Sequence, residues 1–112
     1  MAISNVQVPT TPVIVVQASG LDDMGSPTDR AVLTIIFCNN SIDACAIDVH
    51  ALPGSGDSPS NANKIVNRYT INGEDTFIFT TEDKMVLQPG AKIMASADVD
   101  GAITATANYI DL

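Results

Sequence analysis

Basic residues are scarce in this chain. Its 112 residues include 5 Lys and Arg against 13 Asp and Glu, which gives a formal net charge of -8. The basic residues are scattered singly along the sequence, at Arg30, Lys64, Arg68, Lys84 and Lys92. Binding to a polyanion requires clustered cations that displace counterions from phosphates. We therefore expect neither nucleic acid nor an anionic membrane surface as a partner.

Aromatic residues, cysteines and long apolar runs are also few. The chain contains no Trp, 2 Tyr and 3 Phe, which is a poor set for stacking on sugars or bases. No apolar run approaches the ~20 residues that span a bilayer, and the first six residues lack the pattern of a secretory signal. Cys38 and Cys45 do not have a Cys-x-x-Cys spacing. We expect two reduced thiols, with a cross-strand pair as the alternative if a turn at residues 39–41 closes a hairpin.

Residues that favour β-structure are abundant instead. Val, Ile and Thr total 32, whereas Leu, Glu, Lys, Arg and Gln total 15. Branched side chains lose freedom in helices and pack well on pleated sheets. Strand-like runs separated by turn residues occupy residues 4–8, 12–18, 31–38, 44–52, 64–71, 76–80, 85–87, 91–97 and 102–110. This pattern predicts an all-β, antiparallel β-sandwich of roughly eight strands, jelly-roll or Ig-like, in a single domain covering residues 1–112.

Individual runs give finer expectations. The continuous apolar run Ala31–Cys38 predicts a central strand buried on both faces, whereas the alternation in Ala44–Leu52 predicts a strand with one wet face. Residues 72–73, Asn-Gly, predict a tight type I′ turn. A polar bend is expected at residues 81–83. The proline-punctuated residues 1–12 are either an extended arm that reaches a neighbour or an ordinary edge strand.

A histidine and a serine motif are the first candidates for chemistry. His50 falls on the polar face of its strand, two residues after Asp48, so the pair could hold a metal or act as base and orienter. Because no third ligand or nucleophile follows at a suitable spacing, we interpret His50 as a solvated residue beside a loop. Gly56-Asp57-Ser58 resembles a hydrolase nucleophile motif, but Ser58 precedes a proline in an exposed loop and has no partnered acid and histidine downstream.

Acidic clusters are the remaining candidates. Asp98-Val99-Asp100-Gly101 places alternate carboxylates before a glycine, as at the start of a calcium loop, but the further oxygen ligands and distal Glu are missing. We interpret this segment as a hairpin turn. Asp22, Asp23 and Asp29 form a looser cluster that we interpret as solvated. We accordingly predict no catalytic, cofactor-binding or metal-binding residues and no enzymatic activity.

Protection of the sheet edges is sparse. Exposed edge strands normally carry lysine or proline, which block pairing with other chains, and the only lysines are Lys64, Lys84 and Lys92. Several strands also look apolar on both faces, which is more than an isolated sandwich of this size needs. We expect the domain to pack against copies of itself, as a homo-oligomer, or against a larger assembly.

Four segments within about residues 31–112 carry a resemblance to a known class of proteins. They are Thr34-Ile35-Ile36-Phe37-Cys38-Asn39, Tyr69-Thr70-Ile71 before Asp75-Thr76, Met85-Val86-Leu87-Gln88-Pro89-Gly90-Ala91-Lys92-Ile93, and Asn108-Tyr109-Ile110-Asp111. Over about residues 31–112 the chain resembles the small β-sandwich virion structural proteins of tailed bacteriophages. Such proteins work through surfaces rather than a catalytic motif, so no site residue is carried over.

The resemblance implies a structural component of the virion that is made in the host cytoplasm. A decoration or cement protein on the capsid exterior fits best, because a chain of net charge -8 would be repelled by packaged DNA. Its partners would be the major capsid protein or copies of itself. A neck or tail protein is the alternative within this class. A host-surface glycan-binding module using the loops at residues 19–29 and 53–63, and a metal-dependent enzyme using Asp48 and His50, are the alternatives from other classes.

Overall fold

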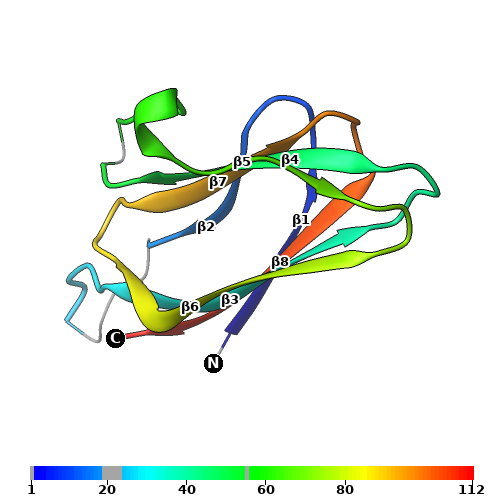
Figure 1. Cartoon of the computed structure of the whole chain (residues 1–112). Helices are drawn as coiled ribbons and strands as arrows, with labels where there is room; N and C mark the ends of the chain where they lie inside the picture. Colours follow the sequence, from blue (N-terminus) through cyan, green and yellow to red (C-terminus); the bar gives the residue numbers. More distant parts are fainter. Residues whose placement is uncertain (1, 19–23, 55) are drawn as a thin grey trace.

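Two layers of antiparallel strands make up the computed structural model, which describes residues 2–18, 24–54 and 56–112. The strands are β1 (Ala2–Val8), β2 (Val13–Gln17), β3 (Arg30–Asn39), β4 (Cys45–Leu52), β5 (Lys64–Ile71), β6 (Thr76–Leu87), β7 (Lys92–Ala97) and β8 (Ile103–Asp111). A 3-10 helix, η1 (Asn61–Asn63), precedes β5. Sheet A has the order β1-β8-β3-β6 and sheet B the order β2-β7-β4-β5, stacked face to face (Figure 1). The predicted all-β sandwich is confirmed.

The hydrophobic core lies between the two sheets. Alternate residues of each strand point into it, as in aligned sandwiches generally. The largest fully buried apolar side chains come from both layers: Phe37, Ile35 and Ile103 from sheet A, and Ile47, Leu52 and Ile93 from sheet B. In each strand, the residues that do not point into the core point outward. Burial of the core therefore also decides which side chains each outer face presents.

Most connections between consecutive strands cross from one sheet to the other. Within the described strands, β4 and β5 are the one consecutive pair that shares a sheet. The segment at residues 98–101 joins β7 to β8 and therefore bridges the two sheets, so its interpretation as a hairpin turn was wrong. Turn residues report a change of direction, but the partner of a strand is decided by long-range packing, which short motifs do not encode.

The connection between β5 and β6 crosses from sheet B to sheet A, and it also differs from the predicted type I′ turn. A type I′ turn needs positive φ at both central residues, but here the positive φ falls at Glu74, at 60°. Gly73 is required for another reason: a Cβ built on it would overlap the backbone carbonyl of Ile42. The glycine therefore permits a close approach of two crossings rather than a mirror-image turn.

A buried amide holds these two crossings together. The Asn39 side chain is 1% exposed; its Nδ2 donates to the carbonyl oxygens of Asp43 (2.9 Å) and Ile71 (3.0 Å), and its Oδ1 accepts from the backbone N of Ser41 (3.0 Å). Cys38 lies in β3 of sheet A and Cys45 in β4 of sheet B, and both are free thiols. The alternative of a cross-strand cysteine pair in one hairpin was therefore wrong.

Two strand predictions need correction. The expected bend at residues 81–83 lies inside β6, where Thr80 faces Thr34 and Met85 faces Val32, so four residues of β6 pass a single residue of β3. β6 continues across this irregularity, as a strand does across a large bulge. As predicted, β3 is a central strand. Burial on both of its faces was wrong, because Thr34, Ile36 and Cys38 on the outer side are only half-buried.

The first strand belongs to the chain's own sheet. Residues 2–8 form β1, which pairs with β8 along its whole length, from Ala2 opposite Tyr109 to Val8 opposite Ile103. This is the second of the two alternatives that the sequence left open, an edge strand rather than a free arm. The far side of β1 is an edge of sheet A.

Candidate functional site

His50 is not the solvated residue that the sequence suggested. It is 5% exposed, and its Nδ1 lies 2.9 Å from Oδ1 of Asn63 in η1. Asn63 also donates from Nδ2 to the carbonyl of Ser58 (2.9 Å) and accepts from the backbone N of Ser60 (2.9 Å). The loop after β4 is therefore folded back over His50, and the residues of the serine motif take part in that local structure.

Asp48 has partners of its own. Its Oδ1 accepts from the backbone N of Arg68 (2.7 Å) and lies 3.8 Å from Nζ of Lys64. These groups stabilise an irregular stretch of β5, where the β4–β5 register shifts twice and Arg68 has a φ of 47°. Asp48 thus contacts backbone and lysine while His50 contacts Asn63, and the two do not form a base and its orienter.

The carboxylates of residues 98–101 bind groups of the protein. Oδ1 of Asp98 accepts from Sγ of Cys45 and from the backbone N of Ala46, both at 3.0 Å, and Oδ1 of Asp100 accepts from the backbone N of Thr10 at 2.6 Å. Burial, together with the hydrogen bond to Asp98, raises the pKa of the Cys45 thiol. The same hydrogen bond holds the pKa of Asp98 below its usual value. Asp98 and Asp100 therefore stabilise the connection between β7 in sheet B and β8 in sheet A.

Among the residues that the structure describes, no group of three or more His, Cys, Asp and Glu side chains is placed to hold a metal ion. Asp22 and Asp23 lie outside the described residues. The backbone carbonyl of Asp29 accepts from the N of Leu112 at 2.9 Å.

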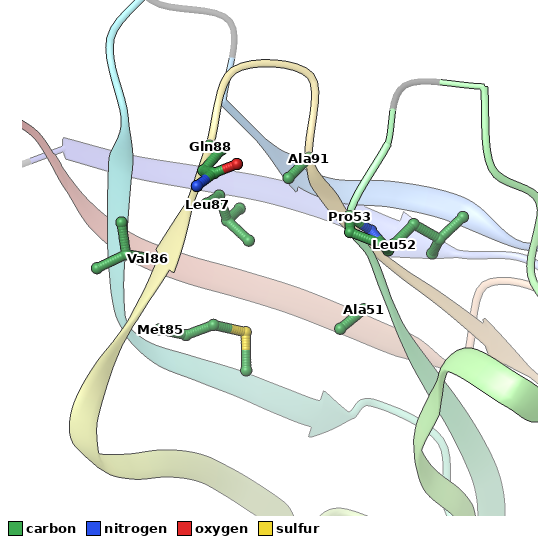
Figure 2. Close-up of a pocket in the computed structure, with 8 residues that line it drawn as sticks. All are labelled: Ala51, Leu52, Pro53, Met85, Val86, Leu87, Gln88 and Ala91. Carbon is green, nitrogen blue, oxygen red and sulfur yellow. The ribbon is translucent and has the colours of Figure 1, made fainter.

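An apolar groove of about 480 Å³ lies between the ends of β4 and β6 (Figure 2). It is lined by Ala51, Leu52, Pro53, Met85, Val86, Leu87, Gln88 and Ala91. Gln88 is the only polar side chain among these residues. The groove has the size and character to receive apolar side chains, but its lining contributes no acid, base or nucleophile.

The outer face of sheet A presents regular rows of uncharged side chains. The strand registers align three rows of side chains across β1, β8, β3 and β6. The rows are Ile3-Asn108-Thr34-Thr80, Asn5-Thr106-Ile36-Ile78 and Gln7-Thr104-Cys38-Thr76. We call these twelve residues the uncharged face, because none of them is Asp, Glu, Lys, Arg or His.

The uncharged face is open to solvent and partly apolar. Ile3 is 64% exposed and Ile78 is 56% exposed, at opposite edges of the sheet, with half-buried Ile36 between them. From strand and row spacings the face covers about 400 Å². Burying it against a partner would remove apolar surface from water without stripping any charge of its hydration, which is the main cost of covering a protein surface.

Sequence reasoning predicted adhesive sheets but not this surface. The alternation of Thr104, Thr106 and Asn108 marks them as one side of β8. Their neighbours on that face come from three other strands, and the order of those strands is not local information. The sequence did contain one signal for this surface. If the inward residues of 34–38 and 104–108 are assigned to the core, the remaining outward residues are uncharged and rich in threonine.

Comparisons with known proteins were made at three levels. The chain matches no protein-family model, no curated protein and no solved structure. Within its described residues there is also no helix with the length and apolar character needed to cross a bilayer.

Proposed function

We propose that this chain is a non-enzymatic structural component of a tailed-phage virion, a decoration or cement protein on the capsid exterior. It docks on the major capsid protein through the uncharged face. The observation that carries the proposal is the absence of charge on those twelve residues in a chain of net charge -8. Natural sheet faces exposed to water normally carry charged side chains, and charge is depleted at the centres of protein interfaces.

The mechanism is adhesion by area rather than chemistry. Ile36 and Ile78 supply apolar contact, while the threonine hydroxyls and the amides of Asn5 and Asn108 can form hydrogen bonds across the interface. Each docked copy bridges neighbouring capsid subunits and adds its contact energy to the stability of the shell. Asp57, Asp98 and Asp100 lie in connections between strands and keep the exterior of the particle anionic.

Two other placements compete with the capsid exterior. A neck or tail protein would use the same face, and the two differ in where the chain sits on the particle. Glycan binding by the loops has less support, because Asn63 and Ser60 in residues 53–63 are engaged in contacts with His50 and with their own loop. Electron microscopy of particles with and without the chain separates the first two: missing density on the shell supports decoration, and missing density at the neck overturns it.

Docking is tested with two variants that add one negative charge at equivalent edges of the two sheets. Ile78→Asp changes the uncharged face on β6, and the control Thr70→Asp changes an exposed residue of β5 in sheet B. Purified chain is mixed with capsids that lack it, and the capsids are pelleted. We expect Ile78→Asp to weaken binding at least about 100-fold, because an unpaired charge is trapped in the interface, and Thr70→Asp to bind within about twofold of the wild type.

Unfolding by urea checks that both variants stay folded. Either of two results overturns docking through the uncharged face. One is wild-type chain that does not pellet with the capsids at any concentration, and the other is an Ile78→Asp variant that pellets like the control.

A further inference from the structure

The four edge strands of the sandwich differ in how they are protected against pairing. In sheet B, β2 is five residues long and its register shifts between Ile14 and Val16. The other edge of sheet B, β5, contains Lys64, two register shifts and the positive φ of Arg68. In sheet A, the register of β6 with β3 is interrupted between Thr80 and Met85. Bulges and charges of this kind are the usual blocks to edge-to-edge association.

β1 carries none of these devices. Its sequence Ala-Ile-Ser-Asn-Val-Gln-Val contains no charge and no proline, and its register with β8 is unbroken from Ala2 to Val8. Among the described strands none pairs with its outer edge. A regular, uncharged edge presents a row of backbone N–H and C=O groups that can accept another strand.

We propose that the free edge of β1 pairs antiparallel with β1 of a second copy of this chain, joining two A sheets into one continuous sheet. A second copy is the occupant because the edge is charge-free in a chain of net charge -8, so two copies meet there without the like-charge contact that other surfaces would impose. A two-fold axis through Asn5 pairs that residue with itself and places Ile3 opposite Gln7 of the second copy.

The proposed pairing extends the uncharged face. An axis perpendicular to the sheet turns both outer faces to the same side, so each row of one copy runs on into a row of the other. The central row becomes Ile78-Ile36-Thr106-Asn5 followed by the same residues in reverse.

The size of the docking interface gives a second argument for a second copy as the occupant. This second argument rests on the proposed function, whereas the first does not. One copy offers twelve residues, whereas a standard interface takes about 20–30 residues from each partner. Two copies joined at β1 present twenty-four residues. The dimer, rather than the single chain, therefore matches the number of residues that specific docking requires.

The pairing is tested on the purified full chain by light scattering after size exclusion. We expect the wild type to have twice the mass of 11.7 kDa. Asn5→Lys puts two ammonium groups side by side on the axis and should raise the dissociation constant at least about tenfold. Ile78→Lys is the matched control, since it lies in the same row at the opposite edge, and should remain dimeric.

A crosslinking experiment fixes the register. In a Cys38→Ser background, where the remaining Cys45 is buried, Asn5→Cys should form an intermolecular disulfide under mild oxidation, because directly opposed residues lie within disulfide reach. Ile3→Cys should not, because its counterpart lies four residues away along the strand.

Three results overturn the proposal: a wild-type monomer at millimolar concentration, equal crosslinking at positions 3 and 5, or loss of the dimer in both lysine variants. The last would indicate face-to-face association. Because these measurements need no capsid, a dimer that fails to bind capsids contradicts the proposed function alone, and a monomer that binds them contradicts this inference alone.

Discussion

The two outer faces of the sandwich have opposite character. The outer side of sheet B carries Asp48, Lys64 and Arg68, two of which form an ion pair, and part of it lies beneath the loop that packs on His50. The uncharged face of sheet A has no charged side chain, and no described element covers it. Sheet B therefore satisfies its charged outer residues within the chain, whereas the outer side of sheet A presents uncharged side chains to solvent.

This difference shows that a sandwich need not treat its two outer faces alike. Both sheets bury one side in the same core, so the fold alone does not dictate the contrast. The contrast depends on side chains that the core leaves unconstrained, and such positions report function more directly than core residues do. Two measurements on the free chain test whether the faces differ energetically as they differ chemically, and a third tests the connection at Asp98.

Removing His50 should give the largest difference between the faces. His50→Ala deletes the contact with Asn63 and leaves a void beneath the loop, so we expect the free energy of unfolding to fall by about 2 kcal/mol. Thr106→Ala at the centre of the uncharged face should change it by less than about 0.5 kcal/mol, as is usual for surface substitutions. Urea unfolding of both variants provides the measurement. Equal losses would show that the uncharged face is as tightly integrated as the covered one.

Relieving the backbone at Arg68 should give a smaller effect of opposite sign. Arg68 adopts a φ of 47°, which costs an L-residue about 1–2 kcal/mol. Arg68→Gly removes this strain but increases the entropy of the unfolded chain, and we expect a net gain of about 0.5 kcal/mol in the free energy of unfolding.

The matched change in sheet A is Thr106→Gly, in a regular strand, and it should lose about 1 kcal/mol. Thermal unfolding of the pair gives the signs. A destabilised Arg68→Gly variant would mean that the conformation at residue 68 is not strained.

The pH dependence linked to Cys45 and Asp98 should be smallest, because Asp98 is exposed. The folded-state pKa of Asp98 is lowered from 3.8, so its contribution to stability is present above that pH and is lost as pH falls below it. The pKa of Cys45 is raised from 9.0, so its contribution is present below that pH and is lost as pH rises past it.

Asp98→Asn is the variant that isolates this pair. The difference in the free energy of unfolding between wild type and variant should be level from about pH 5 to 8 and shrink at both extremes. Urea unfolding from pH 3 to 10 measures it. A difference that does not change with pH would show that the hydrogen bond between Cys45 and Asp98 contributes nothing to either pKa.

Much of the secondary structure could be predicted from the sequence because alternation is local. The predicted strand at residues 64–71 is β5 as observed. Residues 44–52 and 91–97 differ from β4 and β7 by one residue at one end, and residues 102–110 differ from β8 by one residue at each end. Alternating burial also held on β7, where Ile93, Ala95 and Ala97 face the core.

Pairing of strands could not be predicted, because it depends on contacts between distant segments. Nothing near Asn72 or Asp98 specifies that the chain changes sheet there. For the same reason the sequence left His50 on a wet face, since the loop that buries it returns from thirteen residues away. The uncharged face needs the order of four strands at once, so it emerges only from the assembled sheet.

The pairing of β1 with β8 also bears on how the protein is made. Ala2 faces Tyr109, so sheet A cannot close until residues 103–111 have left the ribosome. Until then the nascent chain holds β1 without its partner strand, with both of its edges exposed. Loops of this length close slowly compared with local structure. We expect folding on the millisecond-to-second scale, starting only once residues 103–111 have emerged.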